Sequence, residues 1–424
     1  MKSVQLHPGV HCRFIQDDRF KKLQIKVFMQ MPLTSTAATA AYLLARYLQR
    51  GTERYPEPRQ LRMALEHAYG ANTSISSMTL GQRSGLVAGL SCLADKFVPG
   101  NESVVLEAAE ILWEQLFRPR RENGAFAAGQ FAESKSAHRA QLEQLIDDKA
   151  SYAALQCAQR MARPGETFAI HPMGALAELE QLTPETLWPI YQSFLRSGQI
   201  DVFVFGDITE HQALAVARRL LEGIERQEPV TLFQGTAGCP ECITCREEEE
   251  VLDVEQGRLV LGYRRPLSYT PEALARNALF LNIFGASDQS RLFLQLREAE
   301  SLCYDVDVDQ DVFNGILWVQ TGIDFANKQQ AVDMIRSILL DLSERGPTAE
   351  ELETARILSL DAIRSLADVP SALVGMQLRN LTGGAWITVE QLTAAMQAVS
   401  ADDIRAEAAR ACCDLIYFLR GEAS

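Results

Sequence analysis

The sequence lacks a run of apolar residues long enough to cross a membrane: no uninterrupted stretch approaches the roughly 20 residues of a membrane helix. Met1–Pro8 contains no apolar segment of signal length, so we expect no secretory signal. With a net charge of −14, the chain also lacks the basic surface that phosphate binding requires. We therefore expect a cytoplasmic protein whose partners are neither a membrane nor nucleic acid.

Cysteine is sparse, with nine in 424 residues, and the odd number argues against a disulfide framework. Cys412 and Cys413 are adjacent, which also suits a reducing compartment. Cys239, Cys242 and Cys245 have a C-x₂-C-x₂-C spacing that could offer three thiolates to zinc or to an iron–sulfur cluster. No fourth ligand is evident, so we interpret the segment as a thiol-bearing linker and leave metal binding open.

The elements that are present form two halves of similar order. Each half starts with alternating strands, continues with helices, and closes with a helix, an Asp-led apolar strand and a glycine. Thr183 and Ser400 stand at matching positions as N-caps of the closing helices. The pattern predicts an α+β protein with two homologous domains, each a mainly antiparallel sheet with helices on one face, that enclose a central cavity.

Domain boundaries follow from the same pattern. We expect an N-terminal domain at residues 1–226, a linker at 227–255 and a C-terminal domain at 256–424. The linker carries the charge run Glu247–Glu250, which is typical of a solvated connector.

A motif in the second half, Gly285–Val306, combines a small-residue loop, a helix that opens Ser-Arg-Leu-Phe, and an Arg and a Tyr seven residues apart. It resembles the C-terminal-domain signature of the M16 (pitrilysin-like) metallopeptidases. In that family the Arg–Tyr pair holds the peptide substrate, so the resemblance implies this role for Arg297 and Tyr304. A planar guanidinium and a phenol can both donate to peptide carbonyls. Without the resemblance, a solvated helix Arg and a half-buried strand Tyr would be the simpler reading.

The zinc motif of that family is absent. Active members carry His-x-x-Glu-His on a helix, where the i and i+4 imidazoles share one face and converge on the metal. Counting back from Gly51, Tyr42 and Arg46 occupy the His positions and Ala45 the Glu position. Arg46 has no lone pair to donate and Ala45 cannot act as a base. We therefore expect neither a catalytic residue nor a bound metal at these degenerate positions.

The third zinc ligand of the family is a Glu on a helix far downstream. By resemblance its position falls on Gln141. The correspondence requires an insertion around Val98–Ser103, so Glu143 remains open as the equivalent.

The resemblance covers residues 5–420 and points to the bacterial, non-catalytic members of the M16B group. More narrowly, it points to Firmicute members associated with 5-aminopentanol modification of elongation factor P. It implies a heterodimer with a zinc-bearing M16 subunit and a peptide or unfolded polypeptide as substrate. No cofactor is then expected in this chain, and homodimers of the isolated chain remain open. The alternative is a structural or peptide-binding scaffold without a role in proteolysis.

Overall fold

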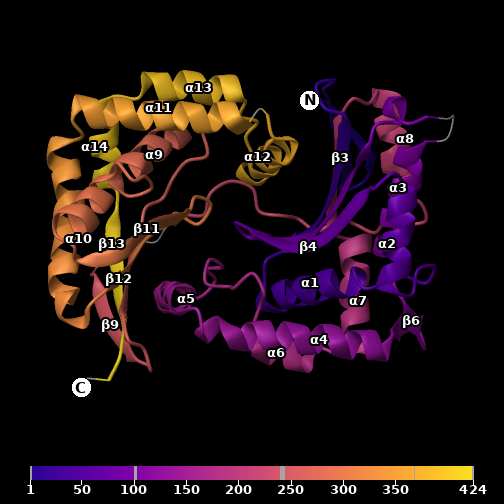
Figure 1. The fold of residues 1–424 in the computed structure, drawn as a ribbon, viewed down its shortest axis with the longest axis horizontal. Helices are drawn as coiled ribbons and strands as arrows, with labels where there is room; N and C mark the ends of the chain where they lie inside the picture. The colour runs from indigo at the N-terminus through magenta and orange to yellow at the C-terminus, as the bar shows by residue number, and fades with distance from the viewer. Residues whose placement is uncertain (1, 100–102, 239–243, 367, 423–424) are drawn as a thin grey trace. The chain divides into compact units, whose positions relative to one another are not determined.

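The structure, a computed structural model, falls into two compact units (Figure 1). The first contains Met1–Glu143 and Ile170–Phe233, and the second contains Gln144–Ala169 and Gln234–Ser424. The residues described are 2–99, 103–238, 244–366 and 368–422. Residues 144–169 thus pack in the second unit, although they lie inside the predicted N-terminal domain.

The first unit is built on a six-stranded sheet of order β1-β2-β8-β3-β5-β4. β2 and β8 are parallel, and the other neighbours are antiparallel. Its strands are β1 (Lys2–His7), β2 (Val10–Gln16), β3 (Lys22–Pro32), β4 (Asn72–Leu80), β5 (Arg83–Leu93) and β8 (Gln199–Gly206), with a separate hairpin of β6 (Arg121–Glu122) and β7 (Ala125–Phe126). Its helices are α1 (Ser35–Leu48), α2 (Pro58–His67), η1 (Asp95–Phe97), α3 (Val104–Phe117), α4 (Ala128–Glu143), α6 (Leu176–Gln181), α7 (Pro184–Arg196) and α8 (Glu210–Leu220).

One hydrophobic core joins this sheet to α1, α3, α7 and α8. Alternate residues of the two central strands enter it, as the two-residue period of a strand requires: Leu23, Ile25, Val27 and Met29 from β3, and Ile200, Val202 and Val204 from β8. Side-chain caps fix where the helices begin. The predicted cap Thr183 is confirmed, because its hydroxyl accepts from the backbone N–H of Thr186.

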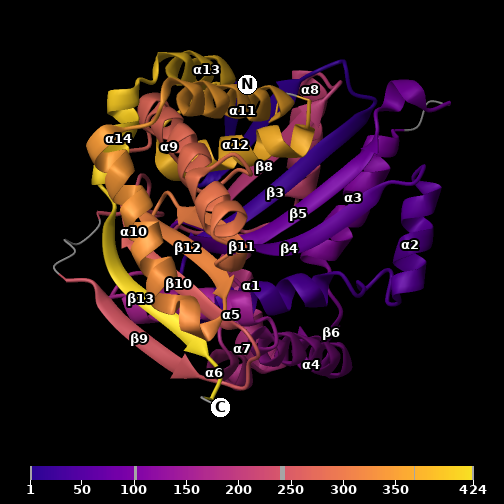
Figure 2. The same cartoon turned by 60° about the vertical axis from the view of Figure 1, so that its left-hand side comes forward.

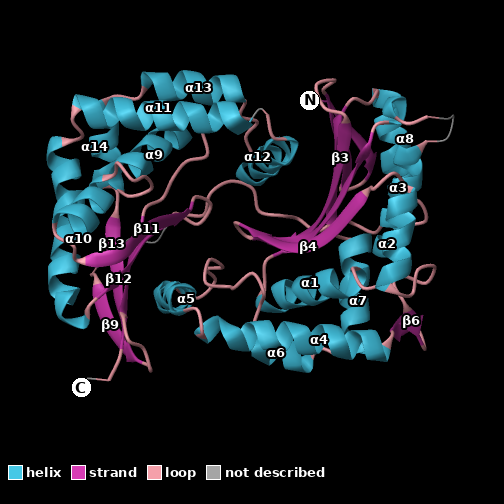
Figure 3. Ribbon diagram, viewed as in Figure 1, coloured by secondary structure: helices cyan, strands magenta, loops and turns pink. Residues whose placement is uncertain are grey.

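The second unit is built on a five-stranded sheet of order β11-β12-β10-β13-β9 (Figure 3). Its strands are β9 (Arg246–Val251), β10 (Gly257–Arg264), β11 (Cys303–Asp311), β12 (Ile316–Ile323) and β13 (Cys412–Arg420). Its helices are η2 (Gln144–Ile146), α5 (Lys149–Met161), α9 (Pro271–Phe284), the π-helix η3 (Phe293–Ala299), η4 (Phe325–Asn327), α10 (Lys328–Arg345), α11 (Ala349–Leu366), α12 (Pro370–Gly383), α13 (Val389–Ala398) and α14 (Ala401–Ala409). The predicted cap Ser400 is confirmed at α14.

The two sheets repeat one topology. β4-β5-β3-β8-β2 in the first unit corresponds to β11-β12-β10-β13-β9 in the second. The last strand of the first sheet, β8, is parallel to β2 and antiparallel to β3, and the last strand of the second, β13, is likewise parallel to β9 and antiparallel to β10. The prediction of two homologous α+β domains with mainly antiparallel sheets is confirmed. The enclosed cavity stays a prediction.

Helix α5 explains why residues 144–169 pack in the second unit. Helices α9, α10 and α14 lie along one face of its sheet in both Figure 1 and Figure 2, and α5 lies on the opposite face. Its apolar residues Ala153, Cys157 and Met161 share a core with β10 and β13. α5 is a separate helix from α4, because the Asp148 carboxylate caps a new helix by accepting from Ser151 N–H.

The charge run was predicted to be a solvated connector, and this prediction is wrong: it forms strand β9, which pairs in parallel with β13. Strand alternation sends its carboxylates to opposite sides of the sheet. Glu247 and Glu249 reach Lys328 of α10, while Glu248 and Glu250 reach Arg160 of α5. The run is acidic because each side of an edge strand meets a cation.

Among the described residues, none of the helices has both the length and the apolar character needed to span a membrane.

Glu250 is expected to hold β9 in place. Its carboxylate accepts from Tyr152 Oη at 2.7 Å, Tyr417 Oη at 2.9 Å and Arg160 Nη2 at 2.6 Å. Hydrogen bonds to a charged group contribute about 1.5–3 kcal/mol, so we expect Glu250→Gln to lower the free energy of unfolding by that amount. The more exposed Glu247→Gln should change it by less than about 1 kcal/mol. Urea denaturation of both variants measures the difference, and equal effects would contradict this role of Glu250.

Candidate functional site

Three of the degenerate metal-motif residues meet in the first unit. Tyr42 and Arg46 lie one turn apart on α1, and Gln141 lies near the end of α4. The Gln141 Oε1 atom accepts from Tyr42 Oη at 2.6 Å and from Arg46 Nη1 at 2.8 Å. Ala45 is buried on the same helix, whereas Glu143 is exposed. Of the two alternatives for the distal position, Gln141 is therefore the one that contacts residues 42 and 46.

These side chains do not fit a zinc ion. The amide oxygen of Gln141 already uses both lone pairs on Tyr42 and Arg46. The guanidinium of Arg46 is cationic and offers no lone pair, so it would repel Zn²⁺. The site instead has the chemistry of a closed polar contact between α1 and α4.

His138 belongs to the same cluster and was missed in the sequence. Its ring centroid lies 4.6 Å from that of Tyr42, and its Nε2 atom is 2.8 Å from the Met173 carbonyl. Burial lowers the pKa of His138 to about 4, so the imidazole is neutral at pH 7. His138 precedes Gln141 by three residues, which places both on one face of α4. That spacing is the signal that could have identified it.

The loop that precedes α6 contacts α1 and supports this cluster. Thr39 of α1 accepts from the Ala175 N–H at 3.1 Å through its hydroxyl. Gly174 has φ +77° and approaches Thr39 so closely that a Cβ would overlap its side chain. Any larger residue at position 174 would push the loop away from α1.

Restoring the ligands tests whether residues 42, 46 and 141 occupy the ligand positions. In the variant Tyr42→His, Arg46→His, Gln141→Glu, two imidazoles and a carboxylate replace the present contacts. We expect zinc at 100 times its dissociation constant to raise the free energy of unfolding by about 2.7 kcal/mol. The control Arg46→His alone should show no such rise. Thermal melts with and without zinc measure this, and an unresponsive triple variant would mean that the three positions are assigned wrongly.

Arg297 and Tyr304 lie in the second unit, both exposed. Arg297 is on the π-helix η3, with its guanidinium 4.9 Å from the Phe293 ring centre. Tyr304 is the second residue of strand β11, is 62% exposed, and donates to the Asp324 carboxylate at 3.1 Å. That hydrogen bond raises the pKa of Tyr304, so the phenol stays protonated. Single-turn π-helices often occur at functional sites.

Arg291 in the same motif has a structural role that the sequence did not indicate. It is buried and forms ion pairs with Asp341 and Glu351, both at 2.7 Å, while it donates to the Gly346 carbonyl at 3.1 Å. These contacts fix the start of η3. The Ser-Arg-Leu-Phe part of the motif thus positions the helix η3, which carries the exposed Arg297.

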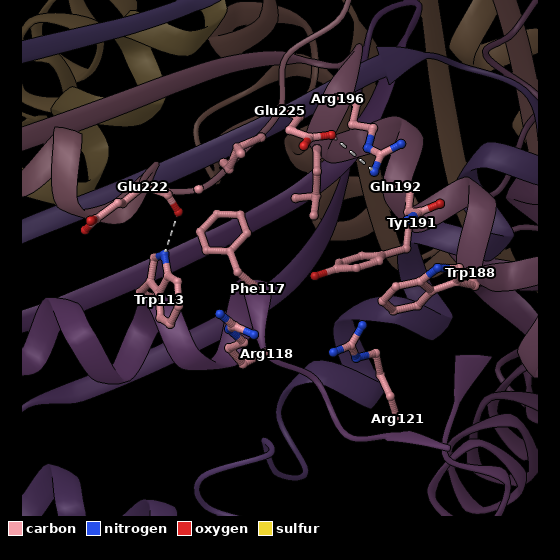
Figure 4. A pocket seen from close by; sticks show the side chains of 13 residues that line it. Trp113, Phe117, Arg118, Arg121, Trp188, Tyr191, Gln192, Arg196, Glu222 and Glu225 are labelled. Carbon is pink, nitrogen blue, oxygen red and sulfur yellow. Dashed lines mark hydrogen bonds and ion pairs between the residues drawn. The ribbon is translucent and has the colours of Figure 1, made fainter. Parts of the chain in front are cut away.

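An aromatic pocket in the first unit was not marked by the sequence. The cavity of about 360 Å³ is lined by aromatic rings of α3 and α7 (Figure 4). The guanidiniums of Arg118 and Arg121 lie 5.4 and 5.5 Å from the ring centres of Trp113 and Trp188. The aromatic residues recur at helical spacing, which is equally the spacing of a packed core. For this reason the pattern alone could not indicate a pocket.

The cysteine motif lies partly outside the described residues. Cys239 and Cys242 belong to the segment that the structure does not describe, and Cys245 is the one member whose place is known. In the described part of the chain, no group of three His, Cys, Asp or Glu residues has the geometry to hold a metal ion. Metal binding by the whole motif stays open.

Comparison with known proteins gives consistent matches. Residues 181–358 match the family model of the peptidase M16 inactive domain. The chain is 26% identical over 415 residues, 98% of its length and 96% of the relative's, to "Probable inactive metalloprotease YmfF" of Bacillus subtilis (strain 168). A conserved protein from Enterococcus faecalis V583 has a crystal structure with a TM-score of 0.90 and 27% identity, covering 100% of this chain and 99% of that one.

A structure of the peptidase M16 inactive domain from Pseudomonas fluorescens has a TM-score of 0.81 and 15% identity, covering 100% of this chain and 98% of that one, and so shares the fold. The assignment of Tyr42 and Arg46 to the family's ligand positions stays a prediction. Residues 181–358 thus match the M16 inactive domain, and the chain as a whole is similar to a probable inactive metalloprotease.

Proposed function

We propose that this chain is the non-catalytic subunit of an M16B-type heterodimeric zinc peptidase in the bacterial cytoplasm. A second M16 chain with an intact His-x-x-Glu-His motif would hold the zinc and carry out hydrolysis. This chain would contribute binding of a peptide or unfolded polypeptide. The observation that carries the proposal is a contrast between its units: Arg297 and Tyr304 are exposed, whereas Tyr42 and Arg46 are engaged by Gln141.

The exposed pair suits an extended peptide. Each peptide residue presents a carbonyl acceptor, and both a guanidinium and a phenol donate hydrogen bonds. The Arg297 side chain rests on the Phe293 ring, which limits the rotamers it can adopt before a peptide binds. Tyr304 would exchange its hydrogen bond with the exposed Asp324 for one to a peptide carbonyl.

Purification of the tagged chain from its native host tests the proposal. We expect a second M16 chain with zinc ligands to co-purify, and the reconstituted pair to cleave peptides in a chelator-sensitive manner. Neither chain alone should do so, and changing a zinc ligand of the partner to Ala should abolish cleavage. Size-exclusion chromatography of the isolated chain would reveal homodimers.

The same experiment separates the alternative of a scaffold with the M16 fold. Stable complexes without any zinc-bearing M16 chain, and without peptidase activity, would favour the scaffold and contradict the proposal. The narrower resemblance to proteins associated with elongation factor P modification stays a prediction. Loss of that modification in a strain lacking this chain would support it.

A further inference from the structure

Two thiols meet where the C-terminal strand begins. Cys245 directly precedes β9 and Cys413 is the second residue of β13, and their Sγ atoms lie 2.7 Å apart. Although 168 positions separate them, the parallel register of the two strands, with Arg246 opposite Leu415, fixes the approach. The pairing of the sheet therefore brings these two sulfur atoms together.

The surroundings favour thiolate chemistry at this pair. The Arg336 guanidinium of α10 hydrogen-bonds to both sulfur atoms. The charge of Asp414 disfavours the Cys245 thiolate, while burial and the two nearby cysteines raise the pKa of Tyr263, which is therefore neutral. The hydrogen bond with Cys413, aided by Arg336, lowers the pKa of Cys245 to about 7, while the same contact raises the pKa of Cys413. Cys245 is thus more readily deprotonated than an ordinary thiol, and the neighbouring guanidinium opposes a metal cation.

We infer that Cys245 and Cys413 are a redox modification site that forms a reversible disulfide by exchange with a low-molecular-weight disulfide. The Cys245 thiolate attacks one sulfur of the small disulfide, which forms a mixed disulfide and releases one small thiolate. Cys413 then gives its proton to that thiolate, and its sulfur attacks Cys245 and releases a second small thiolate. Two cysteine thiols are oxidised and one small disulfide is reduced to two thiols.

The bond would tie the edge strand β9 to the strand beside it. β9 is held by its hydrogen bonds with β13 and by the ion pairs of its carboxylates. It is the first strand of the second sheet along the chain. A disulfide would keep β9 attached to β13 even when the hydrogen bonds between the two strands open locally. Neither cysteine belongs to η3 or β11, the elements that contain Arg297 and Tyr304. This inference therefore does not depend on the proposed peptidase role.

Incubation of the full-length chain with oxidised glutathione at pH 7 tests the site. Peptide mapping without reductant should find a linked pair that contains Cys245 and Cys413, which dithiothreitol separates again. Cys245→Ser and Cys413→Ser should both abolish it, while Cys412→Ser, which removes the exposed neighbouring thiol, should retain it. If Cys245 pairs with Cys412 or another cysteine, stays reduced, or holds stoichiometric zinc that blocks oxidation, the inference is overturned.

The pH dependence of the first step gives a second readout. In the Cys413→Ser variant, the rate at which glutathione attaches to Cys245 measures the first exchange step without the second. With Cys413 present, the oxidation rate should rise with pH around a midpoint near 7. In Arg336→Gln the midpoint should move toward that of an ordinary thiol, and Arg336→Lys should restore much of the shift. An unchanged midpoint in Arg336→Gln would remove Arg336 from the mechanism.

Discussion

Arg297→Ala should lower kcat/KM of the reconstituted heterodimer by about 10- to 150-fold and leave the chain folded. Loss of a charge-assisted hydrogen bond to bound peptide costs about 1.5–3 kcal/mol, which corresponds to this range. Arg297 is exposed on η3, and exposed substitutions usually change stability by less than about 0.5 kcal/mol. Tyr304→Phe should cost less, because it removes only one neutral hydroxyl. Steady-state peptide cleavage measures both variants.

The matched control is Arg364→Ala. Arg364 is also an exposed helical arginine of the second unit, with 71% of its side chain accessible and an ion pair to Asp361 at 3.1 Å. It should leave cleavage unchanged, while melting temperature and complex formation stay at wild-type values in all variants. Normal cleavage by Arg297→Ala, with the partner's zinc ligands still essential, would make this chain a scaffold.

Arg264→Met should destabilise the second unit by about 3–5 kcal/mol, the range for removing one partner of a buried ion pair. Only 1% of the Arg264 side chain is exposed, and Nε donates to Asp414 at 2.6 Å. Its other nitrogens reach Glu166 at 2.6 Å and the Met161 carbonyl at 2.8 Å, at the C-terminus of α5. The change would leave Asp414 buried without this cation and release the end of α5.

Urea denaturation measures this loss, with the exposed Arg364→Met as the control. The double variant Arg264→Met, Asp414→Leu should recover part of the stability, because position 414 then no longer holds a buried carboxylate without its cation. If Arg264→Met and Arg364→Met behave alike, the buried network does not hold α5 on the sheet.

The same network predicts a pH dependence. Burial would raise the pKa of Glu166, but its hydrogen bonds with Arg264 and Arg163 outweigh burial and hold the pKa below its ordinary value. A carboxyl whose pKa is lowered by folding stabilises the protein above its unfolded pKa of about 4.3, and this is lost as pH falls through the lower folded value. The stability difference between wild type and Arg264→Met should therefore be constant from pH 7 to 5 and shrink below about pH 4.

Local features of the chain were predicted well because their causes are local. The caps Thr183 and Ser400 act on backbone groups three residues away, and strand alternation depends on neighbouring residues. The repeated order of strands and helices in the two halves was sufficient to predict two related α+β units. The residue types at positions 42 and 46 also excluded the family's zinc ligands without any coordinates.

Contacts between distant segments were beyond such reasoning. The charge run was misread as a connector because its cations, Lys328 and Arg160, are 79 and 90 residues from Glu249 and Glu250 in the chain. A sequence window of the length used to detect periodicity does not contain both the glutamates and these cations. The aromatic pocket was hidden for a related reason, since rings at helical spacing on two helices become a cavity only when the helices are placed together.

The sequence by itself determined that residues 42 and 46 are not histidines, where its helices begin, and that an Arg and a Tyr follow the M16 pattern. Tertiary structure alone decided that Gln141 is shared by Tyr42 and Arg46, that α5 packs in the second unit, and that two cysteine sulfurs meet. The physical reason is that hydrogen bonding, burial and thiol contact depend on distances in space. Residues tens to hundreds of positions apart acquire such distances only when the sheets and helices pack.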